Sequence, residues 1–136
     1  MTGIDTNVLV RFLTNDDAAQ SPLAQSLIDC FTSQKPGFIS IIALVETVWV
    51  LADLYGHGRD GIALVVQNLL ELEDINLQER DLIWRSLRLF LSSKADFSDC
   101  VVCLLGADSG CEVTVTFDRQ AAKLPGFRLL SARKPQ

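Results

Sequence analysis

The sequence predicts an α/β fold in which a short, mostly parallel sheet lies between helices. Short apolar segments that fit strands alternate along the chain with longer segments of helical periodicity, and turn residues separate them. The clearest strand, residues 113–117, runs directly into Asp118. The chain has 136 residues, of which 49% are hydrophobic, and contains no linker-like stretch. We therefore expect a single domain over residues 1–131, followed by a frayed tail over residues 132–136.

Start and stop signals give the order of the elements. The first strand ends at Asp5, which can cap the helix that follows. Ser21 and Pro22 form a helix start of cap plus proline, unless the second helix begins slightly earlier, near Asp17. Ser40 caps a long third helix. The elements expected after the first strand are helices over residues 8–13, 21–31, 41–55, 59–70, 79–93 and 97–109, strands over residues 38–39, 75–77, 113–117 and 127–130, and a helical turn over residues 121–124.

The third helix is apolar on nearly every side, so we expect it to be largely buried. Glu46 stands in the middle of this helix with hardly a polar neighbour. A carboxylate is rarely buried without a partner, which makes Glu46 a candidate site residue. The alternative is that Glu46 lies on an exposed edge of the helix.

The formal net charge of −5 argues against a protein that binds nucleic acid mainly through a basic surface. It leaves open nucleic-acid binding through a bound cation that changes the charge locally. No apolar run approaches the roughly 20 residues of a membrane span, and no basic segment followed by an apolar one opens the chain. We therefore expect a cytoplasmic protein without a membrane partner.

The four cysteines lack the spacing of a disulfide framework and lie mostly among apolar residues, so we expect reduced core thiols. The alternative is a zinc site formed by Cys100, Cys103, Cys111 and the only histidine, His57. This alternative competes with packing, because Cys100 and Cys103 fall on successive turns of a predicted helix.

Three acids, Asp5, Asp99 and Asp118, lie at the start of a predicted helix or helical turn. Each could serve only as a cap, because an acid there satisfies free N–H groups and the helix dipole for roughly 0.5–2 kcal/mol. Asp96 and Asp99 also have the spacing of a capping box, with Asp in place of the usual Glu. Capping is therefore the alternative to a functional role for these acids.

The predicted topology favours a common site for these acids and Glu46. In a doubly wound sheet, the strand ends before Asp5 and Asp118 lie on one side, together with the N-termini of the helices that carry Glu46 and Asp99. Two carboxylates ~5 Å apart repel each other by about 3 kcal/mol at an effective dielectric constant of ~20, so four must take up protons or cations. Oxygen ligands without a nearby His or Cys select Mg²⁺ or Mn²⁺, which suit phosphoryl substrates and nuclease chemistry.

Four motifs, in this order, resemble those of PIN-domain ribonucleases, and especially of VapC toxins from bacterial toxin–antitoxin pairs. The motifs are Ile4-Asp5-Thr6-Asn7-Val8-Leu9, Glu46 within residues 43–51, Asp96-Phe97-Ser98-Asp99, and Thr116-Phe117-Asp118. The resemblance covers essentially the whole chain, including the spacing of the motifs. It implies a three-layer α/β/α PIN-like fold and Mg²⁺- or Mn²⁺-dependent cleavage of RNA by a metal-activated water.

The resemblance assigns the acidic catalytic metal site to Asp5, Glu46, Asp99 and Asp118. Thr6 and Asn7 match the polar pair that supports the first acid, and Thr116 matches the hydroxyl that often precedes the last. Asp96 either caps its helix or adds to the surroundings of a second metal ion. The family further implies two partners, a VapB-like antitoxin and a second copy of the chain in a homodimer.

Basic residues supply candidate RNA contacts. Arg11 and Arg119 are expected nearer the acids, whereas Arg85 and Arg88 lie on the fifth predicted helix. The alternative for that helix is a solvated, paired face, because Asp81 stands four residues before Arg85.

Three other interpretations compete with a ribonuclease. A receiver-like signalling domain needs paired acids at the first strand and a lysine after a late strand, but Asp5 stands alone and Arg119 follows Asp118. A phosphatase of the aspartyl-phosphate type needs an acid two places after the first, where this chain has Asn7. A non-catalytic PIN-like scaffold that binds an antitoxin is the most serious alternative, although the presence of all four acids counts against it.

Overall fold

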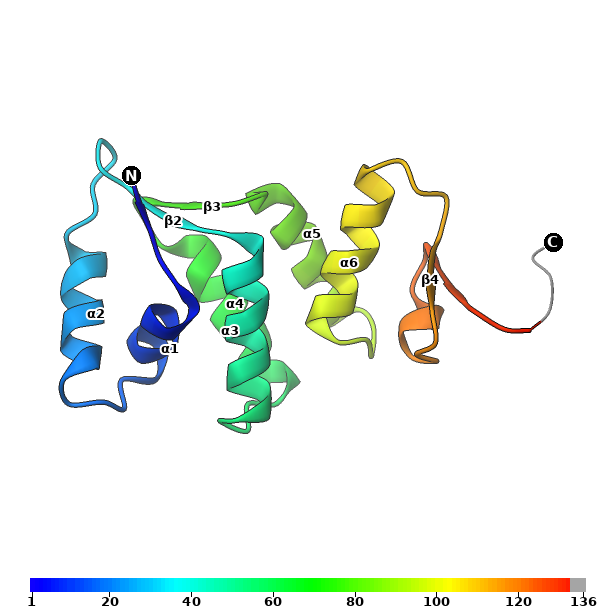
Figure 1. The fold of residues 1–136 in the computed structure, drawn as a ribbon, viewed down its shortest axis with the longest axis horizontal. Coiled ribbons are helices and arrows are strands. Elements are labelled where there is room, and N and C mark those ends of the chain that lie inside the picture. The colour runs from blue at the N-terminus through cyan, green and yellow to red at the C-terminus, as the bar shows by residue number, and fades with distance from the viewer. Residues whose placement is uncertain (133–136) are drawn as a thin grey trace. The chain divides into compact units, whose positions relative to one another are not determined.

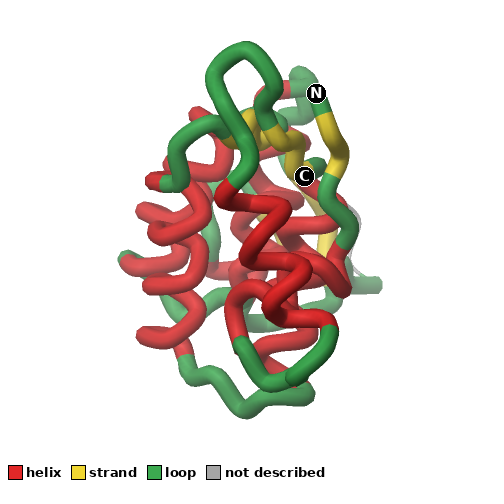
Figure 2. Tube along the Cα trace, turned by 90° about the vertical axis from the view of Figure 1, so that its left-hand side faces the viewer, coloured by secondary structure: helices red, strands yellow, loops and turns green. Residues whose placement is uncertain are grey.

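The computed structural model describes residues 1–132, and its contacts divide the chain into two compact units, Met1–Arg80 and Asp81–Gln136. Six α-helices alternate with five short parallel strands in the described residues, which confirms the predicted α/β class. The strands are brief stretches between much longer helices (Figure 2). The single domain over residues 1–131 stays a prediction, and residues 133–136 of the predicted frayed tail lie outside the described part of the chain.

The first unit contains a three-stranded parallel sheet in the order β1-β2-β3. In this sheet, β1 (Thr2–Gly3) pairs with β2 (Gly37–Ile39), which pairs in turn with β3 (Ile75–Leu77). Because the strands are parallel, their carboxyl ends share one edge of the sheet. The chain therefore leaves β1 toward Asp5 and β2 toward Ser40 on the same side.

Four helices complete the first unit: α1 (Thr6–Thr14), α2 (Gln20–Asp29), α3 (Ile41–Asp53) and α4 (Arg59–Glu71). The helix α1 packs against both α2 and α3, and α3 packs against α4 (Figure 1). The predicted cap of α3 is confirmed, because Ser40 Oγ accepts a hydrogen bond from the N–H of Ala43 at 3.0 Å.

The start of α2 is set by an acid. Asp17 Oδ1 accepts hydrogen bonds from the N–H groups of Ala19 and Gln20 at 3.0 and 2.7 Å. The Ser21 hydroxyl instead donates to the carbonyl oxygen of Arg11 at 2.9 Å. The helix α2 therefore begins at Gln20, between the two predicted starts, and Ser21 ties α2 to α1.

The helix α3 is less buried than its composition suggested. Its buried side chains are Ala43, Leu44, Thr47, Val48 and Leu51. Ile42, Trp49 and Leu54, by contrast, are 72%, 61% and 68% exposed. The expectation that this helix is largely buried is therefore wrong on one face, because side-chain hydrophobicity does not reveal which face has a neighbour.

The second unit pairs α5 (Arg80–Leu91), which begins at the boundary residue, with α6 (Phe97–Asp108). The rings of Phe90 and Phe97 meet edge-on, with centroids 5.9 Å apart. Beyond α6, β4 (Thr114–Thr116) and β5 (Phe127–Leu129) form a separate two-stranded parallel sheet, joined through the short helix η1 (Ala121–Lys123). The parallel strands are thus divided between two sheets, and Phe117 after β4 is 79% exposed.

The cysteines are free thiols, as predicted, but only half of them are in the core. Cys100 and Cys103 are buried, whereas Cys30 and Cys111 are exposed. The Cys103 thiol donates a hydrogen bond to the carbonyl oxygen of Pro125 at 3.0 Å, and burial raises its pKa. Within residues 1–132, no helix has the length and the apolar character that crossing a membrane requires.

Candidate active site

Asp5 and Glu46 line one hollow of the first unit, with a volume of about 400 Å³. Asp5 occupies the N-cap position of α1, and Glu46 lies in the second turn of α3. The other lining residues are Thr6, Asn7, Val10, Arg11, Val50, Leu54 and Tyr55. The packing of α1 against α3 therefore brings together two acids that lie far apart in the sequence.

Asp5 is exposed and has a capping role of limited extent. Its Oδ1 atom accepts a hydrogen bond from the N–H of Thr6, the next residue, at 2.8 Å. A typical N-cap reaches the second or third N–H of its helix instead. The Oδ2 atom has no hydrogen-bond partner in the described part of the chain, so it is available to a ligand in the hollow.

Glu46 is exposed, so it lies on an exposed edge of α3 and is not a buried carboxylate. Its carboxylate makes no ion pair or hydrogen bond with any of residues 1–132. Burial therefore gives no argument for a functional role. The argument that stands is its position, because Glu46 lines the same hollow as Asp5.

Thr6 carries a polar atom that lacks a partner. Its Oγ1 atom is buried and has no hydrogen-bond partner among the described residues. A buried hydroxyl left in this state costs about 1–3 kcal/mol, so a ligand or its water shell beside Asp5 would offset that cost. The carboxylates of Asp5 and Glu46 and the side chain of Asn7 also line this hollow, and oxygen donors of this kind are the ligands that Mg²⁺ or Mn²⁺ prefers.

The second unit holds the other predicted acids. Asp96 occupies the N-cap position of α6, but its side chain makes no capping hydrogen bond, so the capping-box alternative for Asp96 and Asp99 is wrong. Asp118 does cap, because its Oδ1 atom accepts hydrogen bonds from the N–H groups of Gln120 and Ala121 at 2.8 and 3.0 Å. Capping thus accounts for one oxygen of Asp118 and for neither oxygen of Asp99.

The pKa of Asp99 is affected by burial and by the acids around it. Burial raises the pKa of its carboxyl group, and the negative charges of Asp96 and Asp118 raise it further. The neighbouring Thr116 accepts a hydrogen bond from the N–H of Asp118 through its hydroxyl oxygen at 3.0 Å, which holds the backbone that carries this acid. The charged form of Asp99 is therefore disfavoured by its surroundings in the second unit.

The zinc alternative has no geometric support. In residues 1–132, no group of three or more His, Cys, Asp or Glu side chains is placed to hold a metal ion. Asp5 and Glu46 belong to the first unit, and Asp99 and Asp118 belong to the second. The joint four-acid metal site stays a prediction.

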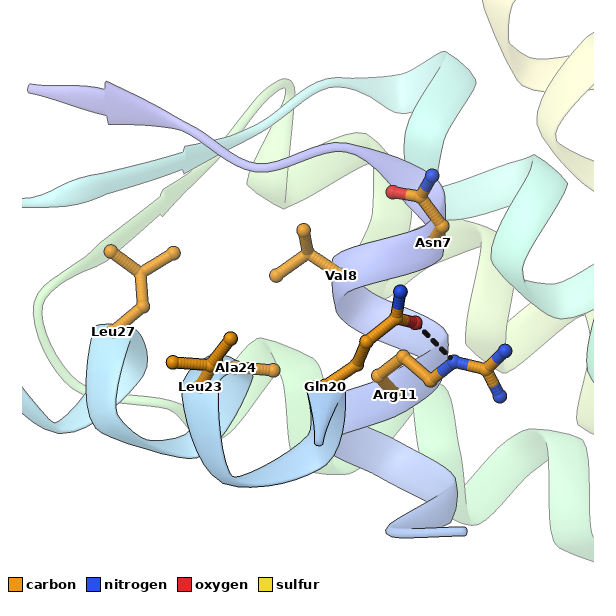
Figure 3. A pocket seen from close by; sticks show the side chains of 7 residues that line it. All are labelled: Asn7, Val8, Arg11, Gln20, Leu23, Ala24 and Leu27. Carbon is orange, nitrogen blue, oxygen red and sulfur yellow. Dashed lines mark hydrogen bonds between the residues drawn. The ribbon is translucent and has the colours of Figure 1, made fainter. Parts of the chain in front are cut away.

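Arg11 is held by residues that the sequence did not single out. Its Nη1 atom pairs with Asp16 Oδ1 at 3.1 Å. Its Nε atom donates to Gln20 Oε1 at 2.9 Å, the hydrogen bond drawn in Figure 3. Tyr55 donates to the other oxygen of Asp16 at 2.9 Å. Asp16 lies 39 residues before Tyr55 in the chain, and no sequence pattern connects the two.

The other candidate RNA contacts differ in their pairing. Arg85 forms ion pairs with Asp81 at 3.3 Å and with Asp108 at 2.6 Å, so the predicted paired face is present at this residue. Arg88 and Arg119 are exposed and make no ion pair with any described residue. Their role in RNA binding stays a prediction.

Two substitutions at Asp5 separate capping from metal binding. Asp5→Asn keeps a capping oxygen, so we expect an unchanged midpoint of thermal unfolding together with a loss of cleavage and of Mn²⁺ affinity. Asp5→Ala removes the cap as well and should lower the free energy of unfolding by about 0.5–2 kcal/mol. Thermal unfolding, an RNA cleavage assay and Mn²⁺ titration measure these effects. Loss of activity in Asp5→Asn only through unfolding would make Asp5 a cap alone.

Comparisons with known proteins cover both units. A family model described as "PIN domain" matches residues 4–126. A protein named VapC ribonuclease from Aquifex aeolicus (strain VF5) is 25% identical to this chain over 128 residues, which is 94% of this chain and 94% of that protein.

Proposed function

Because the chain belongs to the PIN-domain family, we propose that it is a VapC-like, divalent-metal-dependent endoribonuclease. The structural observation that carries the proposal is the hollow shared by Asp5 and Glu46. The hollow offers carboxylate oxygens from Asp5 and Glu46 and the amide oxygen of Asn7, which suit a hard cation, and the unpartnered Thr6 hydroxyl belongs to the residue next to Asp5. The similarity to a VapC ribonuclease over 94% of both chains supports the choice of RNA as the substrate.

The proposed site contains four acids: Asp5, Glu46, Asp99 and Asp118. A divalent ion held by such acids polarises a phosphodiester and lowers the pKa of a bound water. The contacts of three of these acids support the proposal. Asp5 retains a free oxygen while it caps α1, Asp99 makes no hydrogen bond with a described residue, and Thr116 holds the backbone N–H of Asp118.

The proposal includes partners and a cellular location. A VapB-like antitoxin is the proposed protein partner, in line with the VapC-like assignment, and the protein would act as a homodimer in the cytoplasm. A neighbouring small reading frame that encodes an antitoxin would test the toxin assignment directly. Size-exclusion chromatography with light scattering would test the homodimer.

Metal removal tests the ribonuclease. The purified chain should cleave cellular RNA in the presence of Mn²⁺ or Mg²⁺, stop when EDTA is added, and resume when the ion is restored in excess. Sequencing the 5′ ends of the products would identify the RNA and the cleavage site, and Asp99→Asn serves as the inactive control. Intact RNA with either ion, combined with stable antitoxin binding, would instead support a non-catalytic scaffold.

A further inference from the structure

We propose that Arg11 binds a phosphate of the RNA backbone beside Asp5 and Glu46, and that Asp16 and Tyr55 are positioning residues that hold its guanidinium for this contact. The inference rests on the proposed ribonuclease function. It assigns a substrate contact, and the two residues that place it, within the first unit of the chain.

Arg11 stands between two hollows. One is the hollow that Asp5 and Glu46 line. The other, of about 300 Å³, lies between α1 and α2, with Val8, Leu23, Ala24 and Leu27 as its apolar lining and Asn7, Arg11 and Gln20 as its polar lining (Figure 3). Both hollows include Asn7 and Arg11, so an extended polyanion that occupies either of them meets the guanidinium.

Asp16 is the anchor of this guanidinium. Its Oδ1 atom accepts from Thr14 Oγ1 at 2.7 Å as well as from Arg11, and its Oδ2 atom accepts from Tyr55 at 2.9 Å. These hydrogen bonds, first those of Thr14 and Tyr55, lower the pKa of Asp16, so its carboxylate stays charged. Tyr55 also lines the hollow with Asp5 and Glu46, which places the anchor at the edge of that hollow.

One terminal nitrogen of Arg11 is available to a ligand. Nε and Nη1 donate to Gln20 and Asp16, whereas Nη2 has no hydrogen-bond partner in the described part of the chain. The Arg11 side chain is 33% exposed, and in Figure 3 its terminal nitrogens extend away from Leu23 and Leu27. A guanidinium that is already held on one edge loses little freedom when the free N–H groups bind a phosphate.

The same anchor keeps Arg11 away from the acids of the hollow. Arg11 lines that hollow, yet its ion pair is with Asp16, and it makes none with Asp5 or Glu46. Without Asp16, the freed guanidinium would pair with one of these carboxylates and compete with a cation for it. Asp16 therefore leaves the acids free for metal while it holds Arg11 ready for phosphate.

Steady-state cleavage of a short, fluorescent oligoribonucleotide tests the phosphate contact. Arg11→Ala should raise KM about tenfold, as loss of a charge-assisted hydrogen bond does, with kcat within about twofold of the unmodified protein. Tyr55→Phe removes only the anchoring hydroxyl and should raise KM by a smaller factor. Lys35→Ala is the matched control, because Lys35 is exposed, precedes β2 and makes no ion pair with a described residue; it should leave KM unchanged.

Binding measurements give a readout without turnover. In an Asp99→Asn background, Arg11→Ala should reduce the slope of log affinity against log salt by about 0.7, the contribution of one phosphate contact to a single strand. With Asp99 intact, Asp16→Ala should weaken Mn²⁺ binding several-fold. Adding Arg11→Ala to Asp16→Ala should restore Mn²⁺ binding, because the competing guanidinium is gone. A merely structural role of Asp16 would leave Mn²⁺ binding weak in the double variant.

The outcomes separate this inference from the proposed function. Metal-dependent cleavage by the unmodified protein, with an unchanged KM and salt slope in Arg11→Ala, would overturn the inference and leave the ribonuclease proposal standing. The inference is likewise overturned if Arg11→Ala fails to restore Mn²⁺ binding to Asp16→Ala. An unmodified protein that cleaves no RNA with either ion would remove both. Thermal unfolding of each variant checks that it is folded. If Asp16→Ala is unfolded, Tyr55→Phe replaces it as the variant that tests the positioning role.

Discussion

Replacing Asp99 with asparagine is expected to abolish RNA cleavage and yet to raise the midpoint of thermal unfolding at neutral pH. Cleavage should fall at least about 100-fold, because the change removes a proposed metal ligand from a reaction that depends on several kcal/mol of charge stabilisation. The gain in stability follows from the surroundings of Asp99. Burial, and then the charges of Asp96 and Asp118, raise the pKa of this carboxyl group above its ordinary value.

The sign of the stability effect follows from proton linkage. The folded protein binds the Asp99 proton more tightly than the unfolded chain does, so stability falls as the pH rises from the ordinary pKa through the raised one. Neutral pH lies above the ordinary pKa of Asp, so the penalty opposes folding there and asparagine removes it. Because Asp99 is only half-buried, we expect a gain near the lower end of the ~0.5–2 kcal/mol that charge optimisation typically gives.

Asp108→Asn is the matched control for this result. Asp108 ends the same helix, but its hydrogen bond from Arg85 lowers its pKa. Replacing the Asp108 carboxylate with an amide should therefore lower the midpoint of thermal unfolding at neutral pH and leave cleavage intact. Thermal unfolding at pH 7 and at about pH 4, near the ordinary pKa of Asp, should show the gain of Asp99→Asn shrinking in acid. Destabilisation by Asp99→Asn at pH 7 would mean that its carboxylate supports the fold.

Glu46→Gln is expected to reduce cleavage by about 100-fold or more while leaving stability unchanged. Glu46 is exposed and makes no ion pair or hydrogen bond with the described residues, so the fold loses nothing when its charge is removed. The hollow that it shares with Asp5 loses a proposed cation ligand. Cleavage, Mn²⁺ affinity and thermal unfolding are the measurements.

Asp53→Asn provides the control for charge on α3. Asp53 is the last residue of this helix, is exposed and does not line the hollow. It should therefore keep full cleavage activity and Mn²⁺ affinity. Equal losses in Glu46→Gln and Asp53→Asn would point to the overall charge of the helix, and no loss in Glu46→Gln would remove this residue from the site.

Local chemistry made the order of the elements predictable from the sequence. Caps such as Asp5 and Ser40 satisfy N–H groups within a few residues, so their effect can be read without a fold. The exposed face of α3 could not be read in this way, because Ile42 and Trp49 have the same hydrophobicity whether or not a neighbour covers them. The division of the strands between two sheets was equally hidden, since each strand has only a few residues.

The candidate site shows the same limit. Motif spacing identified the acids, but the hydrogen bond that Asp118 donates from its backbone, and those that its carboxylate accepts, appear only in the structure. The anchor of Arg11 depends on a contact between Asp16 and Tyr55, which are far apart in the chain and have ordinary local explanations. Such contacts are set by how α1 and α3 pack, and no local pattern encodes them.

The exposed indole of Trp49 also gives the first unit an optical reporter. Trp49 is one of two tryptophans and lies three residues after Glu46 on α3, where side chains at this spacing have Cβ atoms about 5–6 Å apart. Its emission therefore originates beside the proposed cation ligand, within quenching range of a paramagnetic ion. Titrating the unlabelled protein with Mn²⁺ and following its fluorescence would report occupancy at Glu46 without any added dye.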